Sequence, residues 1–290
     1  MRSSAIVFLC AFIALSASWA GFVLAPQLQL GRAPQEKATG TESLYPVARP
    51  GLAAQGAEVY ISLGCVYCHS QQVGQEGVKC EIILSDAGTN ALATLGALAR
   101  LDANLGKPET LASLPKVIKR VSTVAAAEPI VKPLTDAGAK AYVKVVPVGL
   151  DISRGLGRRR TVAQDYAYDL PVQLGTRRAG PDLANVGVRQ PDLNWHLRHL
   201  YAPKAEVADS TMPPYRFLFE QRPAGKGNPA EALALPKSMV PEGIEIVPTE
   251  AARVLAAYLV SLRVDVPLEE APFTAPPAPP AAPATNSAAK

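Results

Sequence analysis

The most continuous apolar stretch of this 290-residue chain lies close to its amino terminus, in Ala5–Leu24. No charged residue occurs between Arg2 and Arg32. At 1.5 Å per residue, such a run predicts a helix of roughly 30 Å, which is the thickness of the hydrocarbon core of a membrane. A cleaved signal peptide is the alternative, because Ser18-Trp19-Ala20 places small residues where a signal peptidase would cut. The apolar sequence continues past that point, which favours a retained anchor in residues 1–26.

Helical periodicity marks three segments further along the chain. Residues 51–64 and 192–203 place apolar side chains at spacings that share one helix face. A final helix is predicted from Thr249, which has the residue type of an N-cap, through Arg263. Its apolar stripe consists of Val254, Leu255, Tyr258, Leu259 and Leu262.

The sequence between these helices has a different texture. From Lys79 to Val146, two short β-like runs bracket Ala/Leu-rich helical stretches, which predicts a small α/β unit. Residues 27–50 are rich in Pro, Gly and Gln and are typical of a linker, and 147–194 has few periodic positions. Residues 269–290 are an Ala/Pro-rich tail whose composition indicates disorder.

Composition excludes some partners and frameworks. The net charge of +4 and pI of about 8.8 are too mild to indicate nucleic acid as a partner. The four cysteines do not form a disulfide framework, because only two of them are closely spaced. We interpret the other two, Cys10 in the first apolar run and Cys80 in the first β-like run, as apolar core or filler residues.

The strongest chemical signal is the stretch GCVYCHSQQ, residues 64–72. C-x-x-C-H is the attachment signature of a c-type haem, because two thiols reach the two vinyl groups and the adjacent histidine becomes an axial ligand. Cys65, Cys68 and His69 are therefore predicted to hold one covalent haem c. A zinc site would need a second ligand pair, which the remaining cysteine and histidines do not supply. A redox dithiol favours the start of a helix, whereas this motif follows one.

An axial histidine on one face of a haem predicts Met or His on the other face. Met212 stands in a Pro-flanked loop within DSTMPPYRF, from which a thioether can reach a haem iron. Met239, in a similar loop, and His196 and His199, on the helix predicted at 192–203, are the alternatives. The metal ligands are thus predicted to be His69 and Met212.

Three stretches of the sequence resemble a class I cytochrome c. They are GAEVYISLGCVYCH, GPDLANVGVR and HLYAPKAEVADSTM. The resemblance implies that the carbonyl of Pro181 accepts a hydrogen bond from His69 and that Arg189 neutralises a haem propionate. It also implies a close crossing of the first and last helices of the domain at Gly56 and Tyr258.

A narrower resemblance is to the membrane-anchored monohaem subunit, subunit II, of cbb3-type cytochrome c oxidases. It is carried by APQLQLG, YPVARPGL, GCVYCHSQQV, DYAYDLPVQLGTRRAGPDL and STMPPYRFL. It implies a single-pass protein of the bacterial inner membrane with its haem domain in the periplasm. It also implies electron delivery to the catalytic subunit of the oxidase, beside other cytochrome subunits, and no catalysis by this chain.

The chain departs from that family by an insertion at residues 78–146. Its sequence resembles the carboxy-terminal domain of the bacterial ribosomal stalk protein, which implies the order strand–helix–helix–strand–helix–strand. The predicted fold is therefore mainly α: a class I cytochrome c domain in two parts, 51–77 and 147–268, with an N-terminal transmembrane helix and an inserted small α/β domain.

Three functions are compatible with these features. The first is the anchored electron-transfer subunit, and the second is a free-standing anchored cytochrome c that shuttles electrons between other respiratory complexes. The third is a haem-based sensor or interaction scaffold, which an open sixth coordination position would favour. The basic stretch GRRR, residues 157–160, together with Arg177 and Arg178 is compatible with partner docking, with a solvated loop, or with Arg178 joining Arg189 at a haem propionate.

Overall fold

The computed structural model of the chain describes residues 2–30, 34–38, 42–268 and 271. The predicted tail at 269–290 therefore lies almost wholly outside the described residues. The chain divides into two compact units. The first consists of residues up to Val73 and of Thr161–Val266, and the second is built on Gly74–Arg160.

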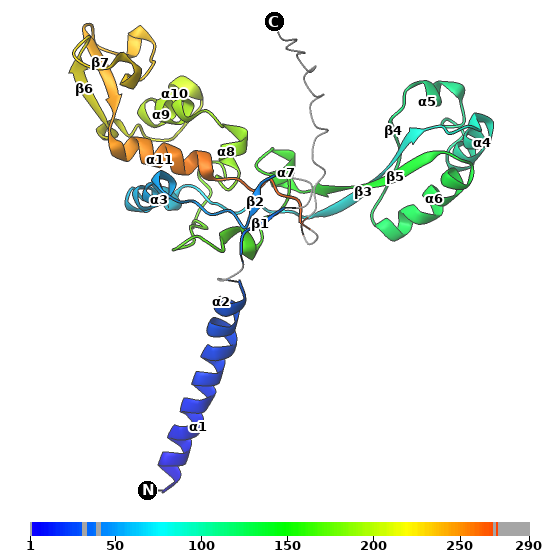
Figure 1. The fold of residues 1–290 in the computed structure, drawn as a ribbon, viewed down its shortest axis with the longest axis horizontal. Helices are drawn as coiled ribbons and strands as arrows, with labels where there is room; N and C mark the ends of the chain where they lie inside the picture. The colour runs from blue at the N-terminus through cyan, green and yellow to red at the C-terminus, as the bar shows by residue number, and fades with distance from the viewer. Residues whose placement is uncertain (1, 31–33, 39–41, 269–270, 272–290) are drawn as a thin grey trace, which may run out of the picture. The chain divides into compact units, whose positions relative to one another are not determined.

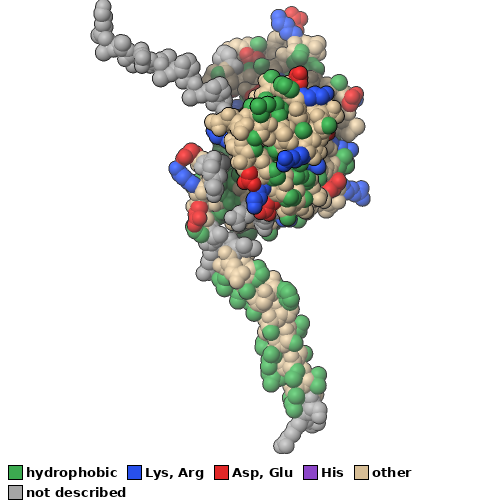
Figure 2. Space-filling model, turned by 90° about the vertical axis from the view of Figure 1, so that its right-hand side faces the viewer, with side chains coloured by type: hydrophobic (Ala, Val, Ile, Leu, Met, Phe, Trp, Pro, Cys, Tyr) green, Lys and Arg blue, Asp and Glu red, His purple; other side chains and the backbone are tan. Residues whose placement is uncertain are grey.

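The amino-terminal segment forms one apolar helix. It comprises α1 (Arg2–Trp19), a π-helical turn η1 (Ala20–Leu24) and α2 (Ala25–Leu30). Ser4–Gln29, 26 residues, is long and apolar enough to cross a membrane. On the face shown in Figure 2, hydrophobic side chains follow this helix without interspersed acidic or basic ones. The prediction of a candidate membrane helix is confirmed in length and composition.

The predicted linker at 27–50 contains more structure than its composition suggested. A two-stranded antiparallel pair joins β1 (Glu36–Lys37) to β2 (Leu44–Tyr45). Tyr45 is buried, and its hydroxyl donates a hydrogen bond to Asp165 Oδ1 at 3.0 Å. Arg49 forms an ion pair with Asp169 in which both side chains are largely buried. Tyr45 and Arg49 thus fix the end of this segment to the first unit. The Pro and Gly content alone gave no indication of these contacts.

The core of the first unit is formed by helices. α3 (Leu52–Ser62), α9 (Leu193–Tyr201) and α11 (Glu250–Ser261) agree with the three predicted helices to within about two residues at each end. Thr249 caps α11, since its side chain accepts a hydrogen bond from Ala252 N. An antiparallel pair of strands, β6 (Phe219–Pro223) and β7 (Ile244–Pro248), precedes α11 (Figure 1).

The first and last of these helices cross at a glycine. A Cβ placed on Gly56 of α3 would lie 1.9 Å from the carbonyl oxygen of Val254 and 2.7 Å from Cβ of Tyr258 in α11. The rings of Tyr60 and Tyr258 continue the contact with centroids 5.3 Å apart. The close crossing implied by the cytochrome resemblance at Gly56 and Tyr258 is present.

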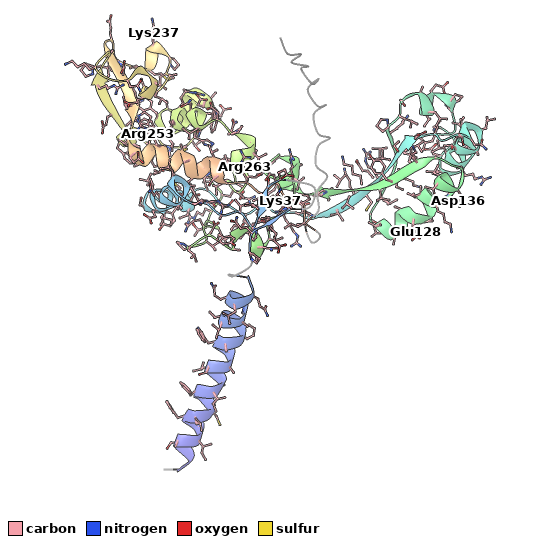
Figure 3. The ribbon with its side chains drawn as sticks, in the orientation of Figure 1. Lys37, Glu128, Asp136, Lys237, Arg253 and Arg263 are labelled. Atoms are coloured by element: carbon pink, nitrogen blue, oxygen red, sulfur yellow. The ribbon has the colours of Figure 1, made fainter. Side chains whose placement is uncertain are left out.

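The second unit is a three-stranded sheet with helices. Its elements follow the order β3 (Gly77–Asp86), α4 (Ala91–Leu101), α5 (Pro108–Ala112), β4 (Lys116–Val121), α6 (Val124–Asp136) and β5 (Lys140–Val148). The strand order is β4-β3-β5, antiparallel throughout. Apolar side chains from all three strands and from α4 and α6 make one core. Glu128 and Asp136, labelled in Figure 3, lie on the exposed side of α6.

This order corrects the two-strand interpretation of the hydrophobic pattern and agrees with the order implied by the stalk-protein resemblance. The compact unit also extends beyond the predicted insertion at 78–146. Gly74 N donates to Asp151 Oδ2 at 2.7 Å, and Leu150 N, in the short helix α7 (Leu150–Ser153), donates to Glu76 Oε1 at 3.0 Å. These contacts tie both flanks of the insertion to each other. Cys80 is buried, as expected for a core residue.

Candidate functional site

The C-x-x-C-H stretch forms a single tight turn after α3. Gly64 adopts a left-handed conformation with φ of 70°, which lets the chain leave the helix and reverse. Cys65–Tyr67 then form a 3₁₀ turn (η2), and the amides of Cys68 and His69 both donate to the carbonyl of Cys65, at 3.1 and 3.0 Å. The two thiols and the imidazole therefore come from one compact piece of backbone.

The thiols are free, and their environment does not favour a redox dithiol. Cys65 is half-buried and Cys68 is exposed. Burial raises the pKa of Cys65 to about 11. A catalytic dithiol needs a lowered pKa so that its thiolate is populated. Among the described residues, no three His, Cys, Asp or Glu side chains are grouped so that they could hold a metal ion, so the zinc alternative has no ligand set there.

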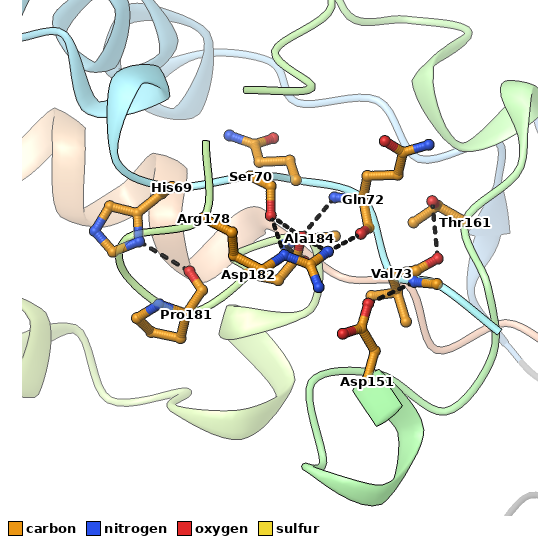
Figure 4. Close-up of polar contacts among 12 residues, drawn as sticks. His69, Ser70, Gln72, Val73, Asp151, Thr161, Arg178, Pro181, Asp182 and Ala184 are labelled. Carbon is orange, nitrogen blue, oxygen red and sulfur yellow. Dashed lines mark hydrogen bonds and ion pairs between the residues drawn. The ribbon is translucent and has the colours of Figure 1, made fainter. Parts of the chain in front are cut away.

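The imidazole of His69 is oriented by the loop that contains Gly180 and Pro181 (Figure 4). His69 Nδ1 lies 2.9 Å from the carbonyl oxygen of Pro181. Since a carbonyl oxygen can only accept, Nδ1 carries the proton and Nε2 is left with its lone pair available to a metal. A Cβ on Gly180 would lie 2.3 Å from His69 Cε1, so a larger residue at this position would displace the imidazole from its present place. Gly180 N also donates to the carbonyl of Cys68 at 2.8 Å.

Arg189 lies at the end of α8 (Val186–Arg189) and has unused hydrogen-bonding capacity. One terminal nitrogen donates to the backbone carbonyl of Asp182, whereas Nε is buried without a hydrogen-bond partner among the described residues. Burial lowers the pKa of Arg189 from its usual value, although the guanidinium stays charged at neutral pH. A buried N–H without an acceptor costs about 1–3 kcal/mol. An anionic group bound beside Arg189 would remove that cost.

Met212 lies in the segment between α10 (Pro203–Glu206) and the 3₁₀ turn η4 (Arg216–Leu218). Its half-buried side chain packs against the same hydrophobic core as Cys65 and Val66. Tyr215, three residues later, donates its backbone N–H to the carbonyl of Leu200 in α9 at 2.8 Å. Burial first, and then the nearby thiols of Cys65 and Cys68, raise the pKa of Tyr215. The loop with Met212 therefore reaches the cysteine turn.

The alternatives to Met212 as the second axial ligand differ in their exposure and in their hydrogen-bond partners. Met239 is 38% exposed on the turn η6 (Lys237–Met239) between β6 and β7. The Nε2 atom of buried His196 lies 2.8 Å from the carbonyl oxygen of Gln190, so this imidazole has a structural partner. His199 stacks on Trp195 with centroids 4.8 Å apart, and its Nδ1 is buried without a partner among the described residues. His199 is thus the histidine that remains available as an alternative.

Sequence reasoning missed the polar residues directly after His69. The side chain of Ser70 and the backbone of Gln72 are bonded to Asp182 and Arg178. Arg178 accordingly has hydrogen-bond partners inside the first unit, while its side chain stays partly exposed. In the sequence, the role of Asp182 was indicated by its position directly after Pro181 in GPDL, residues 180–183.

Part of the chain matches the model of a known family. Residues 151–258 match the model of the family described as "Cytochrome C oxidase, mono-heme subunit/FixO". The matched region includes Pro181, Arg189 and Met212, and the cysteine turn precedes it. No curated protein sequence matches the chain. Over residues 151–258 the chain is thus similar to the monohaem subunit of a cytochrome c oxidase, and its helical first unit is compatible with a cytochrome c domain.

Proposed function

We propose that this chain is a membrane-anchored c-type cytochrome that passes single electrons through one covalent haem to the catalytic subunit of a cbb3-type oxidase. The proposal is carried by one arrangement: two free thiols and an imidazole on a single turn, with Nδ1 of the imidazole held by Pro181 and Nε2 left available. The similarity of residues 151–258 to an oxidase monohaem subunit supports the choice of partner.

The residues present fit a haem. Cys65 and Cys68 would form the two thioethers, His69 would be one axial ligand and Met212 the other. The Nε of Arg189, which has no hydrogen-bond partner in the part of the chain that the structure describes, would supply a donor for a propionate, and Gly180 leaves room beside the His69 ring. When bound, the haem supplies the one-electron redox centre.

The protein's own contribution is orientation and exclusion of water. Pro181 fixes the tautomer and the direction of the His69 ring, because its carbonyl oxygen accepts only from Nδ1–H. The apolar core behind the cysteine turn includes Tyr60, Leu200 and Leu255, which keep water from that side of the site. A thioether from Met212 would favour ferrous iron and so raise the potential.

The partners and the location follow from the proposed role as an oxidase subunit. The catalytic subunit of the oxidase and its other cytochrome subunits would be the partners, and this chain would perform no catalysis itself. The candidate membrane helix Ser4–Gln29 would anchor the chain in the bacterial inner membrane. The haem domain would lie in the periplasm, where thioethers to haem are formed. Amino-terminal sequencing of the mature protein should find residues before Ala20 if the anchor is retained.

The covalent haem is tested by the mass of the acid-unfolded protein, which should exceed the mass of the polypeptide by one haem. Cys65→Ala together with Cys68→Ala should abolish the holoprotein. Cys10→Ala, which changes an exposed cysteine of α1, is the matched control and should leave the mass increase intact. A haem that acid-acetone extracts from the native chain would refute the proposal.

The assignment of Met212 has its own test. Met212→Leu should remove the weak sulfur-to-iron absorption band of the ferric protein and lower its midpoint potential, while both thioethers persist. Met239→Leu is the control and should change neither property. If Met239→Leu or a substitution of His199 produced these effects instead, Met212 would not be the ligand. Co-purification with a haem–copper subunit would separate an oxidase subunit from a free-standing cytochrome.

A further inference from the structure

A fully buried carboxylate lies directly beside the His69–Pro181 contact. The side chain of Asp182 is 0% exposed. Its Oδ2 accepts hydrogen bonds from Ser70 Oγ at 2.6 Å and from Gln72 N at 2.7 Å, and its Oδ1 accepts from Ala184 N at 2.9 Å. Figure 4 shows these bonds converging on one side chain between the segment after His69 and the loop after Arg178.

Arg178 bridges the same two segments. Its Nη2 lies 3.3 Å from Asp182 Oδ2 and also donates to the carbonyl of Gln72, and its Nε donates to Ser70 Oγ at 2.8 Å. The Ser70 hydroxyl therefore accepts from the guanidinium and donates to the carboxylate. Arg178 is 35% exposed, whereas Asp182 is shielded from water, so the cation is better screened by solvent than the anion is.

The connectivity makes Asp182 relevant to the imidazole. Asp182 follows Pro181, whose carbonyl oxygen accepts from His69 Nδ1, and its side chain holds the residue that follows His69. Two backbone bonds flank this arrangement: Gly180 N to Cys68 O and Leu183 N to Ser70 O, both at 2.8 Å. The backbone bonds alone would keep the loop in register. What Asp182 adds is a fixed Pro181–Asp182 peptide and a buried negative charge.

We infer that Asp182 is a positioning residue for the axial histidine and that its buried carboxylate lowers the potential of the haem, with Arg178 partly offsetting it. This inference rests on the proposed function. Ferric haem carries one more positive charge than ferrous haem, so a fixed negative charge in a low-dielectric surrounding stabilises the ferric form. A fixed positive charge acts in the opposite direction.

The opposite signs of the two groups give the test. Asp182→Asn keeps the size of the side chain and removes its charge, and should raise the midpoint potential of the full-length holoprotein in a redox titration. Arg178→Met removes the compensating cation and should lower the potential. A purely structural role would loosen the site in both variants and shift both potentials in the same direction, or shift neither.

The matched control is Asp165→Asn. Asp165 is also a buried carboxylate of the first unit, and it accepts from the Tyr45 hydroxyl and from Val162 N rather than from the segment after His69. This variant should lose stability without a comparable change in potential. If Asp165→Asn raised the potential as much as Asp182→Asn, the effect would not be specific to Asp182 and the inference would be wrong.

The outcomes separate this inference from the proposed function. A wild-type chain without covalent haem would refute the proposed function. A haem-loaded Asp182→Asn protein with unchanged potential would refute only the role of Asp182. If Asp182→Asn does not fold, Arg178→Met decides: a lowered potential with full haem content supports the inference, and an unchanged or raised potential overturns it.

Discussion

The helix crossing at Gly56 gives the sharpest prediction from this structure. In Gly56→Ala, the new Cβ would lie 1.9 Å from the carbonyl oxygen of Val254, where ordinary contact begins at 3.4 Å. The helices α3 and α11 would have to separate locally by about 1.5 Å, because a backbone oxygen cannot rotate away as a side chain can. That movement would strain the hydrogen bond between Gln71 Nε2 and the Tyr258 hydroxyl, now 3.0 Å long.

The magnitude follows from two opposing effects. Replacing glycine by alanine inside a helix returns about 1 kcal/mol of helix propensity. Overpacking of a well-packed core typically costs about 1–3 kcal/mol, and a clash with backbone belongs at or above the upper end of that range. We therefore expect the free energy of unfolding of the first unit to fall by about 2 kcal/mol or more.

Urea unfolding followed by the fluorescence of Trp195, in the full-length detergent-solubilised protein, measures this change. Gln55→Ala, one residue earlier on the exposed side of α3, should stay within about 0.5 kcal/mol of wild type. Gly96→Ala adds the same methyl group in α4 of the second unit, where nothing lies within 4 Å, and should not destabilise that unit. If Gly56→Ala were as stable as Gln55→Ala, the close crossing would not exist in the protein.

Three further predictions follow from the site and the second unit. Gly180→Ala would place a Cβ 2.3 Å from His69 Cε1 and push the ring away from Pro181, so the ferric absorption spectrum should lose its low-spin form. Gly96→Ala, where nothing lies within 4 Å of the added Cβ, is the control and should leave the spectrum unchanged. Replacement of Lys79–Val146 by a short Gly/Ser turn should keep the haem spectrum, because Lys79 and Val146 are paired neighbours in the β3–β5 ladder and a short turn can join their flanks. Loss of the spectrum would show that the second unit is needed for haem binding. Burial lowers the pKa of His196 below its value of 6.5 in the unfolded chain. Below about pH 6.5 the unfolded chain therefore binds a proton that the folded chain does not, and the free energy of unfolding should fall as the pH decreases. His196→Gln should flatten that slope in urea titrations at several pH values, and an unchanged slope would contradict the assignment.

The helices of the first unit were predictable because their signals are local. α3, α9 and α11 each carry an apolar stripe, and Thr249 has the residue type of a cap, so periodicity and capping sufficed. The C-x-x-C-H motif was recognisable for the same reason, because it is contained in five consecutive residues. These elements needed no information about distant parts of the chain.

The strand β4 and the Asp182 cluster were not visible to that reasoning. In Lys116–Val121, basic residues on a sheet edge interrupt the apolar alternation, which weakens a strand pattern. Ser70 and Asp182 are separated by 112 positions, and neither residue type is unusual in its local context. Bonds between polar residues so far apart are set by the tertiary fold, and only the assembled loop shows that Asp182 is buried.

The separation of these partners in sequence is compatible with a well-ordered site because the intervening chain returns to its starting point. Thr161 N donates to the carbonyl of Val73 at 3.1 Å, so the first unit resumes directly beside the place where it was left. Between them, the pairing of Gly77 with Val148 closes the second unit upon itself. The conformational entropy of closing that long excursion is offset by the second unit's own core, rather than by contacts of the site. The segment bearing His69 and the loop bearing Pro181 and Asp182 can therefore assemble as they would in a much shorter chain.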